Sequence, residues 1–80
     1  MTSEQMRAAR MLLRWGQKDI AGASGISLPA IKRMETIPGA LAAQSRTIEA
    51  IRGAFEKAGI EFTNDDFPGV KFVGKPRRKR

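Results

Sequence analysis

Apolar positions recur with a helical period in the first part of the chain. Within residues 4–14, side chains spaced three, four and seven residues apart form one face of a helix. These side chains are Met6, Ala9, Arg10 and Leu13. Either Thr2 or Ser3 can cap such a helix, and Trp15-Gly16 follows its last turn. The pattern therefore predicts a first helix over residues 4–14, with Trp15 packed in the core.

Residues 17–35 contain two shorter helical patterns separated by a glycine. The first begins near Gln17 and stops at Gly25, where we expect a left-handed glycine to end the helix. The second begins behind Ser27, a good N-cap, and carries Pro29 in its first turn, where the missing N–H costs little. Its inner apolar residues are Ile31 and Met34. Two short helices joined by so tight a turn form a helix-turn-helix unit.

A fourth helix and two β-prone segments complete the pattern. Residues 36–44 contain a Pro-Gly pair and predict a loop. Ser45 is placed to cap a helix that ends at Gly59. The apolar side of this helix comprises Ile48, Ile51, Phe55 and Ala58. Residues 60–62 and 70–73 are β-prone and flank a segment with turn chemistry, which predicts a hairpin.

The fold class that follows is mainly α, with four to five helices and a C-terminal β-hairpin or strand. Residues 1–59 make the helix-turn-helix domain, and residues 60–74 are a β-prone segment. A chain of 80 residues with no cysteine has a small core and no disulfide to support it. Residues 60–74 also carry more apolar side chains than a two-stranded hairpin buries alone. We therefore expect a homodimer, with these candidate dimerisation residues: Phe62, Val70 and Phe72.

The charge distribution indicates an anionic partner. The chain has 15 basic and 8 acidic residues, a net charge of +7. Five of the basic residues lie in the last six positions, KPRRKR, and residues 75–80 are predicted to be a disordered basic tail. Such a tail can aid solubility or bind phosphates without sequence preference. A single tryptophan and no tyrosine argue against RNA-binding and single-strand modules, so double-stranded DNA is the expected partner.

The composition argues against several classes of function. The chain has no histidine and no cysteine, which are the usual general base and metal ligands. The pair Asp65-Asp66 is interpreted as turn chemistry. We expect no enzymatic activity, cofactor, metal or small-molecule ligand. Because no apolar run is long enough to cross a membrane and the N-terminus lacks a signal-peptide core, we expect a cytoplasmic, nucleoid-associated protein.

The second helix of a helix-turn-helix unit enters the major groove of DNA. Here, residues 28, 29, 32 and 33 share the face opposite Ile31 and Met34. The first helix of the unit, here called the bracing helix, supports the second. Gln17 begins this bracing helix and can direct its amide and nearby backbone N–H groups at a phosphate. The candidate DNA-binding residues are Gln17, Lys18, Ser27, Leu28, Pro29, Lys32, Arg33 and Arg46.

This arrangement resembles the Cro and phage-repressor family of DNA-binding domains, also called the XRE family, over roughly residues 6–58. The positions that carry the resemblance are Gln17, Ala21, Gly25, Ile26, Ser27, Ile31 and Met34. The resemblance implies a repressor-like fold and an ion pair between Arg10 and Glu35 that joins the first and third helices.

Two departures from the family pattern affect the expectation. Gly22 lies inside the bracing helix, where it costs about 1 kcal/mol relative to alanine. Leu28 and Pro29 stand where relatives often carry hydrogen-bonding base readers. Specific hydrogen bonding to bases therefore rests on Lys32 and Arg33.

The resemblance implies a sequence-specific transcription regulator that acts as a dimeric repressor at a palindromic operator. Repression of its own gene is one form of this activity. Two alternatives stay open: the DNA-binding antitoxin of a toxin–antitoxin pair, and a protein-interaction module built on a helix-turn-helix scaffold. The sequence does not separate repression from activation, and it does not give the operator.

Overall fold

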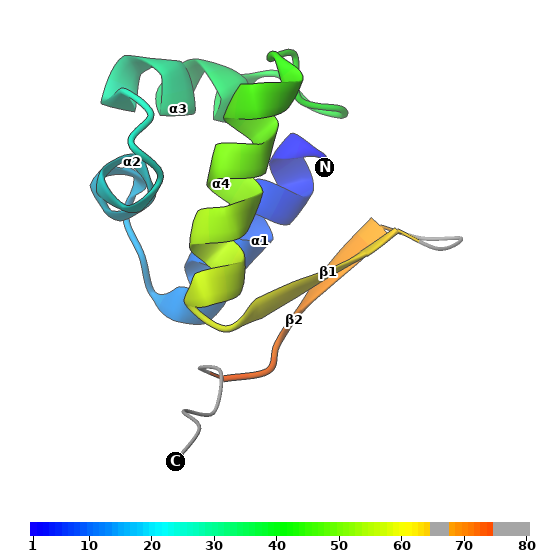
Figure 1. Cartoon of the computed structure of the whole chain (residues 1–80). Coiled ribbons are helices and arrows are strands. Elements are labelled where there is room, and N and C mark those ends of the chain that lie inside the picture. The colour runs from blue at the N-terminus through cyan, green and yellow to red at the C-terminus, as the bar shows by residue number, and fades with distance from the viewer. Residues whose placement is uncertain (65–67, 75–80) are drawn as a thin grey trace.

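The computed structural model describes residues 1–64 and 68–74, and it contains four helices followed by a β-hairpin (Figure 1). The helices are α1 (Ser3–Leu13), α2 (Gln17–Ser24), α3 (Leu28–Thr36) and α4 (Ser45–Lys57). The strands are β1 (Ile60–Asn64) and β2 (Pro68–Phe72). The predicted mainly-α fold with a C-terminal hairpin is confirmed. The expected basic tail and the Asp65-Asp66 turn lie outside the described residues.

The first helix is capped at both ends. Of the two predicted N-caps, Thr2 is the one used: its Oγ1 accepts from the Gln5 backbone N–H at 3.0 Å. The Gln5 side chain in turn accepts from the Thr2 backbone N–H at 2.9 Å, which completes a capping box. The last helical residue is Leu13, and the C-cap is Arg14, which adopts a left-handed conformation with φ 59°.

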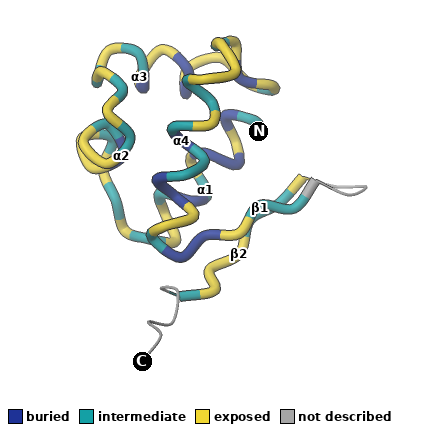
Figure 2. The backbone as a smooth tube through the Cα atoms, in the orientation of Figure 1, coloured by how far each residue is buried: buried dark blue, intermediate teal, exposed yellow. Residues whose placement is uncertain are grey.

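The hydrophobic core lies where the four helices and β1 meet (Figure 2). Its largest fully buried side chain is Phe55 of α4. Trp15 stacks on this ring with centroids 5.8 Å apart, and Phe62 meets it edge-on at 5.9 Å. Trp15 is therefore part of the core, as predicted. The other buried apolar residues are Met6, Ala9, Ile20, Ile31, Met34, Leu41, Ile51, Ala54 and Ile60.

One prediction about the boundaries of α4 is wrong: Ser45 is not its N-cap. The N-cap is Gln44, whose side chain makes no capping hydrogen bond, and Ser45 is the first helical residue. At the other end, Gly59 has φ 108°, and a Cβ there lies 2.6 Å from the carbonyl oxygen of Gly74. Only glycine fits this position, because both the backbone conformation and the close approach exclude a side chain. The predicted glycine end of α4 is confirmed.

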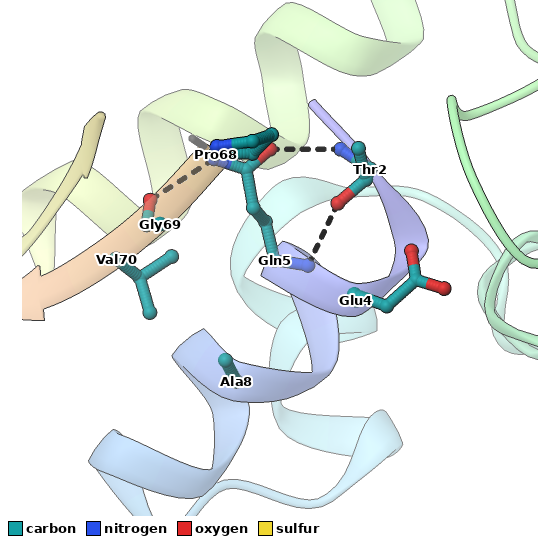
Figure 3. A pocket seen from close by; sticks show the side chains of 7 residues that line it. All are labelled: Thr2, Glu4, Gln5, Ala8, Pro68, Gly69 and Val70. Carbon is teal, nitrogen blue, oxygen red and sulfur yellow. Dashed lines mark hydrogen bonds between the residues drawn. The ribbon is translucent and has the colours of Figure 1, made fainter. Parts of the chain in front are cut away.

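The hairpin packs its apolar face on the helices. Its antiparallel register pairs Ile60 with Phe72 and Phe62 with Val70. Ile60, Phe62 and Val70 pack in or against the core. The Gln5 side-chain nitrogen donates to the Gly69 carbonyl oxygen at 3.0 Å (Figure 3). It also donates to the Thr63 carbonyl oxygen at 3.1 Å, so it ties both strands of the hairpin to α1. Within the described residues, no helix is long and apolar enough to span a membrane.

Candidate nucleic-acid interface

The connection between α2 and α3 is three residues long and is held by local hydrogen bonds. Gly25 adopts the predicted left-handed conformation, with φ 78°, and its N–H donates to the Ala21 carbonyl at 2.9 Å. The Ser24 hydroxyl donates to the Ile20 carbonyl at 2.7 Å and accepts from the Ile26 N–H at 3.2 Å. A serine in the last turn of a helix carries no sequence pattern that reveals this double role. These bonds fix where α3 starts relative to α2.

The start of α3 agrees with the prediction from the sequence. Ser27 is the N-cap, and its Oγ accepts from the Ala30 N–H at 3.3 Å. Pro29 lies in the first turn, where the helix loses no hydrogen bond to it. The turn is therefore held by hydrogen bonds between residues close in sequence.

The two faces of α3 differ sharply in exposure. Ile31 is fully buried and Met34 is 6% exposed, so this side holds the helix on the core. Pro29, Lys32 and Arg33 are exposed, and Leu28 is half-buried. We call these four residues, Leu28, Pro29, Lys32 and Arg33, the outer face of α3. The predicted separation of the two faces is confirmed, and α3 lies at one edge of the molecule (Figure 1).

A buried carboxylate holds the inner side of this unit. The Glu35 side chain is 4% exposed and receives two bonds from the Arg10 guanidinium, Nε to Oε2 and Nη2 to Oε1, both 2.8 Å. The predicted ion pair between α1 and α3 is therefore confirmed. Its hydrogen bonds to Glu35 raise the pKa of Arg10 above its ordinary value, so the guanidinium stays charged. The two parallel N–H to oxygen bonds also fix the relative orientation of the two helices.

Gln17 takes part in the same cluster. Its side-chain Nε2 donates to Glu35 Oε1 at 3.1 Å, so the amide is oriented by the ion pair. The sequence indicated only that this amide faces a phosphate. Since an amide nitrogen has two N–H donors, the bond to Glu35 leaves one donor for another acceptor. The backbone N–H groups of Gln17 and Lys18 also have no acceptor within the helix, whereas that of Asp19 donates to the Gly16 carbonyl at 3.1 Å.

Two further candidates, Lys18 and Arg46, are exposed in the first turns of α2 and α4. The role of Asp19 was not predicted from the sequence. This residue follows Lys18 in the first turn of α2, and its Oδ2 accepts from the Gly16 N–H at 2.7 Å. This bond compensates for the absent side-chain cap at Gly16. An acidic residue three positions after a potential N-cap is the signal that points to it.

The structure separates the three candidate dimerisation residues. Phe62 packs against Phe55, and the Arg52 guanidinium carbon lies 5.8 Å from its ring centroid. Val70 is also packed against the core. Phe72, by contrast, is 54% exposed, and the next residue, Val73, is 57% exposed. Only the end of β2 therefore offers large apolar side chains to a second molecule within the hairpin residues that the structure describes.

A groove of about 390 Å³ lies between α1 and β2, apart from α3 (Figure 3). It is lined by Thr2, Glu4, Gln5, Ala8, Pro68, Gly69 and Val70. Its one carboxylate is Glu4, whose pKa is lowered first by the hydrogen bond from its own backbone N–H and then by that from the Gly39 N–H, which donates to Oε1 at 3.1 Å. Among the described residues, no group of three or more Asp or Glu side chains is arranged to hold a metal ion.

Comparison of the chain with protein-family models, with curated proteins and with solved structures gave no match.

Proposed function

We propose that this protein is a sequence-specific, double-stranded-DNA-binding transcription regulator of the Cro and phage-repressor type, acting as a dimeric repressor in the cytoplasm. The observation that carries the proposal is the outer face of α3. It presents two cationic donors, Lys32 and Arg33, on a short helix whose opposite face is fixed by core residues and by the Glu35 carboxylate.

The geometry suits entry into the major groove. That groove is about 12 Å wide and admits one α-helix. Arg33 has the planar donor pair that matches the O6 and N7 acceptors of guanine, and Lys32 offers rotatable donors one position earlier. Because α3 is capped and packed before any DNA arrives, little ordering of its backbone is needed on binding. Repression then follows from occupying a promoter.

Phosphate contacts position such a protein on the duplex. The second N–H of the Gln17 amide and the backbone N–H groups of Gln17 and Lys18 are suited to one phosphate oxygen. Lys18 and Arg46 add exposed positive charge at two helix starts. These contacts carry no sequence information, so they raise affinity for all duplexes alike.

The test begins with selection of bound duplexes from a random library, using the full chain. Binding to the selected duplex and to random DNA is then compared for Arg33→Ala, Lys32→Ala and Gln17→Ala. The first two variants are expected to lose about 1–3 kcal/mol on the selected duplex and to relax preference at one or two base pairs in each half-site. Gln17→Ala is expected to weaken binding to both kinds of DNA more evenly.

The matched control is Lys57→Ala, which removes an exposed positive charge at the C-terminal end of α4. It is expected to change affinity only slightly and to leave base preference intact. Equal losses on selected and random DNA for Arg33→Ala, Lys32→Ala and Gln17→Ala contradict the assignment of α3. If no duplex is retained even at low salt, the protein-interaction module is the better reading.

A further inference from the structure

The first turn of α3 carries an apolar surface that the fold does not use. Leu28 is half-buried, but it is not among the partly buried apolar residues that pack against the core in the described part of the chain. Its neighbours Ile26 and Ala30 do pack there. Pro29 is exposed beside it. Pro29 suits a helix start, whereas Leu28 has no comparable role within the monomer.

We propose that Leu28 and Pro29 form a contact site for the C5-methyl group of a pyrimidine in the major groove. This inference rests on the proposed function, because it assigns a ligand to the same outer face of α3. Neither side chain has a hydrogen-bond donor or acceptor, so neither reads the polar edge of a base. The C5-methyl of thymine is the apolar group that the base edges present in this groove.

The same methyl group is carried by 5-methylcytosine, which differs from cytosine only at this ring position. The site therefore prefers a 5-methylpyrimidine, and thymine and 5-methylcytosine are its two sources. A duplex with unmethylated cytosine at the contacted position loses the apolar contact while it keeps the same base-pairing partner. Binding is consequently sensitive to cytosine methylation wherever cytosine stands at that position.

The position of the methyl group relative to the hydrogen-bonded base follows from helix geometry. Leu28 and Pro29 precede Lys32 and Arg33 by four residues each, which is about 6 Å along the helix axis. Base pairs are stacked about 3.4 Å apart, so the two contacts fall within about two base pairs of each other. The recognised step is thus a methylpyrimidine close to the base bound by Lys32 or Arg33.

The experiment starts from the duplex selected in the library. Each thymine is replaced in turn by uracil, which removes the methyl group and nothing else. Affinity of the wild-type chain is expected to fall about fourfold at one or two positions per half-site, the factor for losing one buried methyl-sized group. At those positions, a cytosine–guanine pair is then compared with its 5-methylcytosine counterpart. Methylation is expected to raise affinity by a similar factor.

Two variants connect the effect to the protein. Leu28→Ala and Pro29→Ala are expected to bring the thymine-to-uracil affinity ratio towards one at those positions, with circular dichroism showing that the helices are retained. The matched control is Met11→Ala, an apolar side chain that is 71% exposed on α1, and it keeps the wild-type ratio.

The outcomes separate this inference from the proposed function. Specific binding with no position sensitive to uracil or to 5-methylcytosine overturns the methyl contact alone. A methyl effect that persists unchanged in both Leu28→Ala and Pro29→Ala also overturns it. Failure to select any duplex overturns the proposed function, and the methyl contact with it.

Discussion

At the scale of single residues, Glu35 has more partners than the sequence predicted, which was an ion pair with Arg10 alone. Its carboxylate binds Arg10 from α1 and Gln17 from α2, and its backbone carbonyl accepts from Arg7 Nη1 at 2.8 Å. The side chain is nearly buried, so the donors of Arg10 and Gln17 replace water that the carboxylate has lost. Three helices therefore depend on one residue for their mutual orientation.

We predict that Glu35→Ala lowers the free energy of unfolding by about 3–5 kcal/mol, because it leaves the partly buried Arg10 charge without its partner. Urea unfolding followed by circular dichroism measures this. The matched control is Glu61→Ala, which removes an exposed carboxylate 3.8 Å from Lys71 and is expected to cost at most about 1 kcal/mol. Similar small losses for both variants contradict the structural role of Glu35.

At the scale of elements, local chemistry accounts for what the sequence predicted correctly. The α2–α3 turn was predictable because Gly25 and Ser27 each satisfy a conformational or hydrogen-bonding need of the backbone beside them. Ser45 was misplaced because adjacent Gln44 and Ser45 leave the helix start ambiguous by one residue. Arg14 was missed because a left-handed arginine has no sequence signature.

The parts of the site that escaped prediction depend on contacts distant in sequence. The pattern placed Gln17 at a helix start, but its orientation follows from Glu35, which α3 brings alongside it. The number of apolar side chains in residues 60–74 indicated that one face of the hairpin, including Phe62 and Val70, needs a surface to pack against. It did not show whether that face meets the chain's own helices or a second copy. The structure assigns both residues to the chain's own core.

Gly22 provides a test at the level of one element. It lies in α2, it is exposed, and a Cβ added there meets no atom within 4 Å. We predict that Gly22→Ala stabilises the protein by about 1 kcal/mol, since alanine loses less conformational entropy in a helix. For a domain of this size, thermal unfolding is expected to shift upward by about 4–8 °C.

The matched control for this prediction is Gly59→Ala, which places a methyl group 2.6 Å from the Gly74 carbonyl oxygen in a left-handed backbone. That variant is expected to be destabilised. A Gly22→Ala chain that melts at or below the wild-type temperature shows that α2 requires glycine for a reason outside its own helix.

At the scale of the whole molecule, the apolar side chains that the hairpin leaves exposed favour contact with a second copy of the chain. The radius of gyration is 12.1 Å, and the core is correspondingly small. The hairpin already buries Ile60 and packs Phe62 and Val70 against the helices. The end of β2 nevertheless leaves Phe72 and Val73 more than half exposed. We propose that these two residues, rather than Phe62, form the centre of a homodimer contact.

A two-fold dimer accounts for both stability and operator recognition. Binding to half-sites one helical turn apart requires such a dimer to hold its two copies of α3 about 34 Å apart on one side of the duplex. Phe62 is a poor probe of this contact, because its ring packs on Phe55 and its replacement perturbs the monomer. Phe72 is the better probe, since its exposed ring contributes less to the core.

We predict that Phe72→Asp shifts the protein from dimer to monomer in sedimentation velocity experiments at micromolar concentration. The same variant is expected to bind a palindromic operator far more weakly, while its affinity for an isolated half-site changes little, because α3 is untouched. Ile37→Asp is the matched control: it charges an apolar residue that is 52% exposed at the C-cap of α3, outside the hairpin, and is expected to remain a dimer. A wild-type chain that sediments as a monomer and binds a half-site as tightly as the palindrome contradicts the dimer, because two linked reading helices must bind a palindrome more tightly than one.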